Sequence, residues 1–394
     1  MYIKIFFPFL TLLLIQLLGF FFYEGFSFFP SYLTKIVVIL TYVISITTIL
    51  FFCIITKNFK GKLNINYEDK NNRFFSILFF LVTILFINKP TIILYFLGQE
   101  LGFDYIRDKF FSLEALRASV FGSATIAAMT LMYITPILWF YTILLIGKKD
   151  KISVFLFYYT LFSLVLFNLS YAGRFYIYFA LIVLYLKNTL EGGGVLLFFK
   201  KYILLVSLFI FSSFFILNVR TNSDYVAQNN DNQALFSMIE YHLMQPFFWA
   251  QKVDTGTFSG DTYPFKLIIE SVFFPLFYLA GKGFSDISYG YYANEFGAFT
   301  LYSIKTGSSY NAFATLYAYL YSDFGVFTPF FSSFFIMWIF FLSKIIKDVN
   351  IRLKYLSFFC LMLYFSLFQA PIFSPGSLLI LLILPFVLKF KFKY

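Results

Sequence analysis

The stretch Ser153–Leu186, SVFLFYYTLFSLVLFNLSYAGRFYIYFALIVLYL, carries a single charged side chain, Arg174, in its 34 residues. A helix needs about 20 consecutive apolar residues to cross a bilayer, and Tyr171-Ala172-Gly173-Arg174 divides this stretch into two apolar halves. At 1.5 Å per residue it gives about 51 Å of helix, whereas two full crossings need about 60 Å. We therefore expect a tight helical hairpin whose turn, with Arg174, lies below the outer membrane surface.

The whole chain of 394 residues shares this apolar character. It is 60% hydrophobic and 25% aromatic, and 12% of its residues are charged, against roughly 25% in an average soluble domain. Composition therefore predicts a polytopic membrane protein. The net charge of +11 comes with Lys clustered in short loops, which indicates membrane topology and excludes nucleic acid as the expected partner. Cys53 and Cys360 lie in separate apolar runs, so neither a disulfide nor a zinc site is expected.

Apolar runs elsewhere predict further membrane-spanning helices. Outside the hairpin they are Ile5–Tyr23, Leu33–Thr56, Phe74–Leu97, Val120–Ile146, Tyr202–Val219, Val326–Ser343, Tyr355–Phe373 and Leu378–Leu388. The first run has no small-residue cleavage site after it, so we expect an uncleaved helix rather than a signal peptide. The pattern predicts an all-α polytopic integral membrane protein of about ten transmembrane helices, with a range of about 9 to 12. Asn88-Lys89-Pro90 is expected to kink or end the third helix.

Lysine-rich loops set the predicted orientation. Basic side chains gather in Lys57–Arg73, Gly147–Lys151, Lys187–Lys201, the loop around Lys347 and the tail after Leu388. Positive charge marks cytoplasmic loops, so both termini are expected in the cytoplasm, with residues 1–394 forming a single membrane domain. The break Gly192-Gly193-Gly194 has no following Lys-Ser/Thr, so it predicts flexibility rather than a phosphate loop.

A long polar segment, residues 220–309, interrupts the apolar runs and is expected on the non-cytoplasmic face, as a long loop with partly embedded short helices. It holds the single histidine, His242, and many of the acidic residues. Within it, Leu267–Gly281 is apolar but too short to span, which favours a re-entrant or interfacial segment. Tyr310–Ser322 is expected to be a partly embedded helix leading into one crossing. For both stretches, spanning and re-entry remain open alternatives.

Arginines are distributed against the charge rule. Four of the six, Arg107, Arg117, Arg174 and Arg220, are expected on the external side. A charge near the bilayer is costly and is usually kept for a partner, and a guanidinium offers a fork of donors that suits phosphate. Arg117, Arg174 and Arg220 therefore predict a cationic site for a lipid phosphate or pyrophosphate. The alternative is that each one snorkels or pairs with a nearby acid, such as Asp224 for Arg220.

Candidates for a general base lie in the long polar segment. An imidazole titrates near neutral pH, which suits His242 to that task, although a lone histidine is more often structural. Glu240, Asp261 and Glu270 are rival candidates for the same proton transfer. Asp-x-Asp pairs, His-rich clusters and nucleotide loops are missing from the sequence, so we expect neither a metal nor a cofactor. Arginine would then stabilise a departing pyrophosphate in place of a metal.

Aromatic and acidic residues after the long segment suggest a carbohydrate site. Asp323 follows a tyrosine-rich run that begins at Tyr310. Rings and carboxylates in a water-facing groove can stack on sugars and bind their hydroxyl groups. An aromatic belt at the membrane interface accounts for the same tyrosines.

Several short elements together resemble the Wzy family of bacterial O-antigen and capsule repeat-unit polymerases. They are Gly173-Arg174 at the hairpin turn, Asn218-Val219-Arg220 at a helix end, Tyr310-Asn311-Ala312-Phe313 after the long segment, and Tyr321-Ser322-Asp323-Phe324-Gly325 beyond it. The Phe- and Tyr-rich, Lys-biased composition is also typical of that family. The resemblance covers nearly the whole chain as a pattern.

This resemblance implies a metal-independent glycosyltransferase of lipopolysaccharide or capsule polysaccharide biosynthesis in the bacterial inner membrane. Undecaprenyl-pyrophosphate-linked oligosaccharides would be joined on the periplasmic face, and the pyrophosphate carrier would leave. Arg174 and Arg220 would hold the pyrophosphate with Arg117 in support, and His242 or a nearby carboxylate would take the proton.

The resemblance also implies the remaining contacts and partners. Asp323, Tyr171, Tyr310 and Asn311 would bind substrate, with Asp323 shaping the sugar groove or fixing arginine geometry. The partners implied are the lipid-linked oligosaccharide, membrane lipid and a chain-length regulator.

Three other functions fit part of the pattern. An O-antigen ligase shares the arginines and a His-bearing external loop, but Arg174 and the Asp323-Phe324-Gly325 element favour the polymerase. A flippase for the same lipid usually has two similar halves, and no internal repeat is visible. A structural scaffold would leave the external arginines unexplained.

Overall fold

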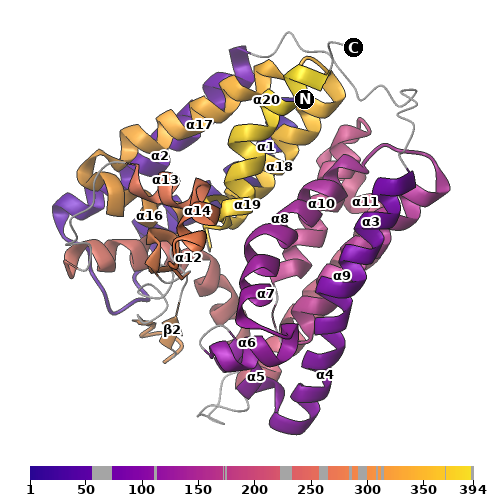
Figure 1. Ribbon diagram of the computed structural model, residues 1–394. Helices are drawn as coiled ribbons and strands as arrows, with labels where there is room; N and C mark the ends of the chain where they lie inside the picture. Colours follow the sequence, from indigo (N-terminus) through magenta and orange to yellow (C-terminus); the bar gives the residue numbers. More distant parts are fainter. Residues whose placement is uncertain are drawn as a thin grey trace. The chain divides into compact units, whose positions relative to one another are not determined.

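The computed structural model describes residues 1–55, 73–110, 113–171, 173, 175–221, 233–256, 265–283, 286–291, 300–307, 309–311, 315–368 and 370–391. Its chain forms two compact units. Unit 1 comprises Met1–Lys60, Asp231–Asp348 and Tyr355–Tyr394, and unit 2 comprises Gly61–Asn230 and Val349–Lys354. Figure 1 shows the helices that make up each unit.

Seven helices in the described part of the chain are long and apolar enough to cross a membrane. They are Tyr2–Phe22, Tyr32–Ile55, Arg73–Leu101, Ala124–Leu144, Lys151–Leu169, Val195–Ser212 and Leu316–Ile345. Phe175–Leu190 and Pro375–Val387 are apolar but shorter. These helices confirm a mostly helical, multi-pass membrane protein, while ten crossings and the placement of the termini stay predictions.

Unit 1 contains most of the elements that follow the long polar segment. Its elements are α1 (Tyr2–Phe22), α2 (Tyr32–Ile55), α12 (Gln233–Asp254), α13 (Lys266–Val272), α14 (Phe274–Leu279), β1 (Thr300–Tyr302), β2 (Ser309–Asn311), α16 (Leu316–Phe324), η5 (Gly325–Phe327), α17 (Thr328–Ile345), η6 (Pro371–Phe373), α19 (Pro375–Leu378), η7 (Leu379–Ile383) and α20 (Leu384–Lys391). α18 (Val349–Phe365) begins in unit 2 and continues in unit 1.

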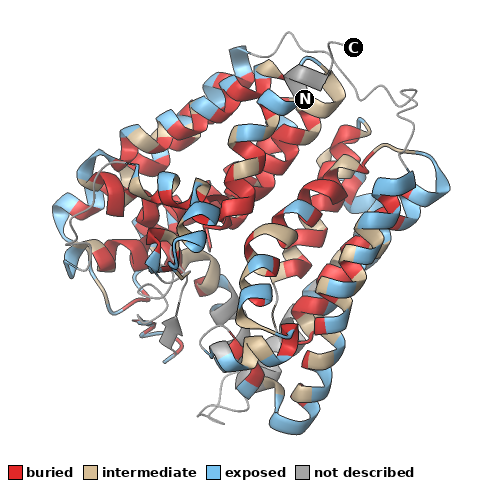
Figure 2. Ribbon diagram, in the orientation of Figure 1, coloured by how far each residue is buried: buried red, intermediate tan, exposed pale blue. Residues whose placement is uncertain are grey.

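Aromatic and small residues hold unit 1 together. Phe52 of α2 stacks on Phe340 of α17, with ring centroids 4.9 Å apart and planes 7° apart. A Cβ atom on Gly19 of α1 would lie 2.6 Å from a methyl group of Leu243, so a larger residue there would require Leu243 of α12 to shift. Buried and exposed residues form stripes along the helices in Figure 2. The exposed stripes include large apolar side chains such as Leu18, 55% exposed, which is the surface that a bilayer covers.

Unit 2 is built around the predicted hairpin. Its elements are α3 (Arg73–Thr83), η2 (Ile84–Asn88), α4 (Lys89–Leu101), α5 (Phe103–Phe110), α6 (Glu114–Phe121), α7 (Ala124–Met129), η3 (Thr130–Ile134), α8 (Thr135–Leu144), α9 (Lys151–Leu169), α10 (Phe175–Leu190) and α11 (Val195–Thr221). α9 and α10 form the hairpin, broken where the sequence predicts. At 1.5 Å per residue, the 16 residues of α10 give about 24 Å, less than the roughly 30 Å hydrocarbon core.

Two prolines lie within continuous helical segments of unit 2 without ending them. Pro90 follows the π-helical turn η2, and Pro136 follows the π-helical turn η3. A π turn adds one residue to the turn and so accommodates the missing proline N–H. The expected alternatives for Asn88-Lys89-Pro90 were a kink or an early exit; the helix continues to Leu101.

Several predicted boundaries are wrong. α11 begins at Val195 rather than Tyr202, where the backbone instead leaves helical geometry (φ −119°, ψ 18°) and kinks. The expected loop Lys187–Lys201 is therefore mostly helical. Gly122, at φ +92°, ends α6, and Ser123 caps α7 through the N–H of Ile126 at 3.1 Å, so the next span starts later than Val120.

The segment after the long loop also differs from its prediction. An antiparallel pair, β1 and β2, joins Leu301 to Tyr310 in register, so the fold is not entirely helical. α16 begins only at Leu316, because Thr315 caps it by accepting the N–H of Ala318. The apolar Leu267–Gly281 forms two helices, α13 and α14, of seven and six residues. Both are far too short to span a bilayer.

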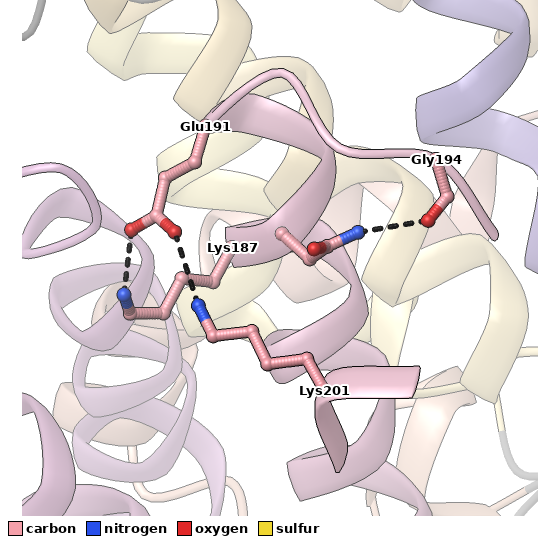
Figure 3. Close-up of polar contacts among 5 residues, drawn as sticks. Lys187, Glu191, Gly194 and Lys201 are labelled. Atoms are coloured by element: carbon pink, nitrogen blue, oxygen red, sulfur yellow. Dashed lines mark hydrogen bonds and ion pairs between the residues drawn. The ribbon is translucent and has the colours of Figure 1, made fainter. Parts of the chain in front are cut away.

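The turn between α10 and α11 is held by polar contacts. Lys187 pairs with Glu191 at 2.5 Å, and Lys201 of α11 reaches the same carboxylate at 3.9 Å (Figure 3). Asn188 donates from Nδ2 to the carbonyl of Gly194 at 3.0 Å. Gly192 adopts φ +94°, which L-residues other than glycine rarely take. Gly192 therefore permits the tight turn that follows α10, and the predicted flexibility of this break stays a prediction.

Candidate functional site

The turn between α9 and α10 is built on one asparagine. Asn168 is buried and donates from Nδ2 to the hydroxyl oxygen of Tyr171 at 2.6 Å. Its Oδ1 accepts the N–H of Tyr176 at 3.0 Å, and its carbonyl accepts the N–H of Gly173 at 2.8 Å. A Cβ atom on Gly173 would lie 2.8 Å from Cγ of Asn168 and 2.8 Å from the Tyr171 ring. The turn that carries Arg174 therefore requires glycine immediately before it.

Arg174 itself lies outside the described residues, and so does Ala172. The residues that flank Arg174, Gly173 and Phe175, are described, with Phe175 as the first residue of α10. The structure thus defines where the hairpin turn starts and ends, and the role of Arg174 stays a prediction.

Arg117 and Tyr171 both contact Phe110. Arg117, on α6, donates from Nη1 to the carbonyl of Phe110 at 3.4 Å. The buried Phe110 ring stacks on Tyr171 with centroids 5.0 Å apart and planes 14° apart. Tyr171 is only 7% exposed, so its position fits the packing of the turn better than direct substrate contact. Two predicted site residues are therefore close in unit 2.

The other two arginines expected on the external side are placed by backbone alone. Arg107 is in α5, and Arg220 is the last but one residue of α11. Their side chains are outside the described part of the structure. Arg220 does lie at a helix C-terminal end, as the sequence predicts.

His242 lies on a helix that is held near both ends. Near its start, α12 carries the fully buried Glu240, whose oxygens accept hydrogen bonds from Tyr23, from Ser303 Oγ at 2.6 Å and from Thr306 Oγ1 at 2.9 Å. These three hydroxyl groups come from the end of α1 and the loop after β1. Glu240 therefore ties three parts of unit 1 together, and its oxygens are already used as acceptors.

At the other end of α12, Asp254 caps a different helix. It accepts the N–H of Ser31 at 2.6 Å, the hydroxyl of Ser31 at 2.7 Å and the hydroxyl of Thr34 at 2.5 Å. Ser31 immediately precedes α2, so Asp254 satisfies the first donors of that helix. Desolvation raises the pKa of Asp254, but the hydrogen bonds from Ser31 and Thr34 outweigh it and leave the pKa below its ordinary value.

The His242 ring is partly exposed between these two attachments. It meets the ring of Phe368 edge-on, with centroids 5.6 Å apart and planes 89° apart, while Tyr241 stacks on the same ring at 6.0 Å. Packing thus orients the imidazole, and the residue is partly exposed. This arrangement suits proton transfer, provided that substrate reaches it.

Two further carboxylates serve structural hydrogen bonds. Asp323 of α16 is 6% exposed and accepts the N–H of Leu267 with Oδ2 at 2.9 Å. It thereby caps α13 from another helix, because the residue preceding α13, Phe265, adopts φ +68° and offers no side-chain cap. Glu270 accepts both the N–H and the hydroxyl of Ser288 with Oε2, each at 2.7 Å.

The tyrosines near Asp323 belong mainly to the core. Tyr317 is fully buried and packs against Tyr42, with centroids 5.1 Å apart, and against Trp249 at 5.9 Å. Tyr319 is 4% exposed and packs on Tyr289 at 5.7 Å. Tyr317 and Tyr319 therefore do not line a water-facing groove, because α16 turns both rings inward, whereas Tyr321 is partly exposed.

Tyr310 and Asn311 occupy β2, opposite Leu301 and Thr300. Their side chains lie outside the described part of the structure. Asp261, the remaining rival base, is also outside it. In the described ranges, no three His, Cys, Asp or Glu side chains lie close enough to share a metal ion.

Sequence reasoning missed Asn168 and the three hydroxyl partners of Glu240. A local signal was available for the asparagine, because Asn168-x₄-Gly173 recurs as Asn188-x₄-Gly193. In both turns the glycine N–H donates to the asparagine carbonyl at 2.8 Å, which is the outer bond of a Schellman motif. The partners of Glu240 lie at least 63 residues away along the chain, beyond any local pattern.

The fold defines the class, a mostly helical, multi-pass membrane protein. One unit contains buried carboxylates and a partly exposed histidine. The other unit contains a glycine-dependent hairpin turn next to an arginine in the sequence. Comparisons with protein-family profiles, characterised proteins and solved structures found no match to this chain.

Proposed function

We propose that this protein polymerises undecaprenyl-pyrophosphate-linked oligosaccharide repeat units on the periplasmic face of a bacterial inner membrane. The proposal rests on the short elements that resemble the Wzy family and on one structural observation. That observation is the difference between His242, which is partly exposed on α12, and the carboxylates Glu240, Glu270 and Asp323, which are buried and hydrogen-bonded.

This difference favours His242 as the general base. A base must accept a proton from a substrate hydroxyl within hydrogen-bond reach. Glu240 accepts from three hydroxyl groups and is fully buried, so using it would break the contacts that hold α12. His242 can take a proton without breaking any hydrogen bond of the Glu240 or Asp254 attachments.

The proposed reaction is a substitution at an anomeric carbon. A hydroxyl oxygen of the incoming repeat unit forms a bond to the anomeric carbon of the growing glycan, and its proton passes to His242. The bond from that carbon to the pyrophosphate oxygen breaks, and polyprenyl pyrophosphate leaves with the electron pair. The resemblance assigns Arg174 and Arg220, with Arg117 in support, to stabilising the negative charge on the leaving group.

Arg117 supports the proposed site through the hairpin turn. It donates to the end of α5 and shares Phe110 with Tyr171. We assign it to positioning the hairpin turn, and through the turn Arg174. Tyr171 would act in the same way, as a packing residue rather than a ligand of the sugar.

A polysaccharide ladder in the source strain tests the proposal. The gene is deleted and then restored as wild type, Arg174→Ala, Arg174→Lys or His242→Gln, with membrane levels matched by immunoblot. Deletion should leave core carrying a single repeat unit, and only wild type should restore the ladder fully. Arg174→Lys should stay well below wild type, because an ammonium lacks the fork of guanidinium donors.

Arg352→Ala is the matched control, because Arg352 lies on the predicted cytoplasmic side; it should restore the ladder. Core without any repeat unit after deletion would instead indicate the ligase or flippase alternative. A full ladder from Arg174→Ala, at normal protein level, would refute the assigned role of the arginine.

A further inference from the structure

The two short helices α13 and α14 expose an apolar face and bury their polar side chains. Leu276 is 62% and Leu279 is 82% exposed, whereas Glu270 and Ser271 are buried. The large side chains on the exposed face are Ile269, Phe273, Leu276, Tyr278 and Leu279. A helix at a water-facing surface turns its apolar residues inward and its charged residues outward. This pair of helices has the reverse arrangement, which suits an apolar surrounding.

Glu270 is held on the inner side by hydrogen bonds. Its Oε2 accepts the N–H and the hydroxyl of Ser288, each at 2.7 Å. Glu270 is the single charged residue between Lys266 and Lys282, so the exposed face between these two lysines carries no charge. A contiguous apolar face of this kind marks a surface that a partner or a membrane covers.

The backbone at both ends of the pair is satisfied within the protein. At the start, Asp323 accepts the N–H of Leu267 with Oδ2 at 2.9 Å. At the end, the N–H of Lys282 donates to the carbonyl of Phe277 at 3.0 Å, around Gly281 at φ +85°, which is the outer bond of a Schellman motif. Hydrocarbon offers no partner to a backbone group, so both end contacts suit a segment that lies in a bilayer.

The exposed face adjoins the surface of a membrane-spanning segment. α13 contacts α16, and α16 and α17 belong to Leu316–Ile345, one of the helices long enough to cross a membrane. Ile268 of α13 and Trp338 of α17 line one apolar groove of about 240 Å³, which is enclosed mainly by rings of α16 and α17. Trp338 is 47% exposed. The hydrocarbon that covers α17 therefore extends to α13.

The pair is too short to cross that hydrocarbon. Its seven and six residues give about 20 Å of helix, against a core of about 30 Å. Lys282 follows the pair and is exposed, with Nζ 5.2 Å from the centre of the Phe277 ring. A lysine at the end of a membrane-embedded segment keeps its ammonium among the headgroups. These features place the pair in one leaflet.

We propose that α13 and α14 form a wedge inserted in one leaflet of the bilayer, with its exposed face against phospholipid acyl chains and Lys282 at the headgroups. A protein partner fits this face less well, because protein interfaces carry about one hydrogen bond per 100–200 Å². The exposed side chains of the wedge offer a single polar group, the hydroxyl of Tyr278.

The wedge attaches the middle of the long polar segment to the membrane. It lies along the chain between α12, which carries His242, and β1. The segment is thus held at the bilayer between its two ends instead of extending freely from it. This inference does not depend on the proposed function.

Spin labels on single introduced cysteines test the wedge in the full chain, reconstituted in phospholipid nanodiscs. Leu276→Cys and Leu279→Cys report on the exposed face of the wedge. Leu208→Cys, at an exposed apolar position of α11, is the lipid reference, and Lys305→Cys, at an exposed position after β1, is the water reference. The native cysteines are buried, and labelled wild type corrects for any signal from them.

The measurement compares how often each label collides with molecular oxygen, which concentrates in hydrocarbon, and with a water-soluble nickel complex. Oxygen should dominate at Leu276 and Leu279, as at Leu208, and a label on Lys282→Cys should lie shallower than the label at Leu276. Labels that favour the nickel complex, as at Lys305, would show that the face meets water. Labels that are immobilised and closed to both reagents would show that protein covers it. Either result overturns the wedge.

A charge on the wedge gives an independent test. Leu279→Asp places a carboxylate in hydrocarbon, so it should lower the unfolding midpoint in nanodiscs clearly more than Ile304→Asp, which adds the same charge at another exposed apolar position, after β1. Equal midpoints for the two variants would contradict insertion. Neither measurement uses the polysaccharide ladder, so the wedge and the proposed function are tested separately.

Discussion

Replacement of Gly173 by alanine should distort the hairpin turn without replacing any charged residue. Gly173 is not among the residues with positive φ, so the backbone itself tolerates alanine. The obstacle is steric: the new Cβ would overlap the side-chain amide of Asn168 and lie 2.8 Å from the Tyr171 ring. Asn168 is 1% exposed and cannot swing into solvent.

The size of the effect follows from what must move. Adding one carbon to a packed site costs about 1–3 kcal/mol. If Asn168 shifts enough to lose its 2.6 Å bond to Tyr171, a buried polar group left without a partner adds about 1–3 kcal/mol. We expect the two together to lower stability by about 2–6 kcal/mol. Displacement of the turn should also weaken the polysaccharide ladder, since Arg174 follows directly.

Gly194→Ala is the matched control, because a Cβ there would meet nothing within 4 Å. Thermal unfolding of both variants in the same detergent measures the difference, and complementation of the deletion strain measures activity. A Gly173→Ala protein as stable and as active as Gly194→Ala would refute the steric reasoning. Loss of the ladder with unchanged thermal stability would instead indicate that the turn affects function without contributing to overall stability.

Three further predictions concern the carboxylates of unit 1. Glu240→Ala should lower stability by about 2–5 kcal/mol, because three hydroxyl groups lose a buried acceptor. Thermal unfolding measures this loss, with the exposed Glu24→Ala as control. An unchanged unfolding midpoint would contradict the anchoring role of Glu240. Asp254 has a folded-state pKa below its ordinary value of 3.8, so its stabilising contribution is present above that value and is lost as pH falls through the folded pKa. The midpoint difference between wild type and Asp254→Asn should therefore shrink on acidification below about pH 4, and a difference independent of pH would show that its charge is not involved. Asp323→Leu should lower the stability of the fold by about 1–2 kcal/mol, because α13 loses its cap. Asp323→Asn keeps a carbonyl acceptor and should lower the stability less. Equal decreases in the thermal midpoint would argue against capping.

Hydropathy predicted the long membrane helices well, because a bilayer demands an apolar run whose backbone bonds to itself. The starts of α1 and α2, at Tyr2 and Tyr32, lie within three residues of the predicted ones. The predicted start of the span, Tyr202, coincides with a kink at which two helices of α11 meet, and the first of them, from Val195 through Lys200 and Lys201, was expected to be a loop. Lys201 then pairs with Glu191, and charged side chains at a membrane edge are compatible with helix.

Residue types also identified the chemically capable groups but could not rank them. Glu240 and His242 are two positions apart and were both candidates for proton transfer. In the structure one is fully buried against three hydroxyl groups and the other is partly exposed. The sequence around them does not predict which one is buried, because the partners that bury Glu240 are distant along the chain. They are Tyr23, Ser303 and Thr306.

By itself, the sequence determined that this protein is a multi-pass helical membrane protein and where its hairpin turns. Those properties depend on composition and on periodicity over a few turns. Only the tertiary structure decided that Glu240, Glu270 and Asp323 are structural acceptors, that Tyr317 and Tyr319 are core residues, and that α16 and α17 enclose an apolar groove. These properties depend on which distant segments pack together, and burial with its hydrogen bonds is set by that packing.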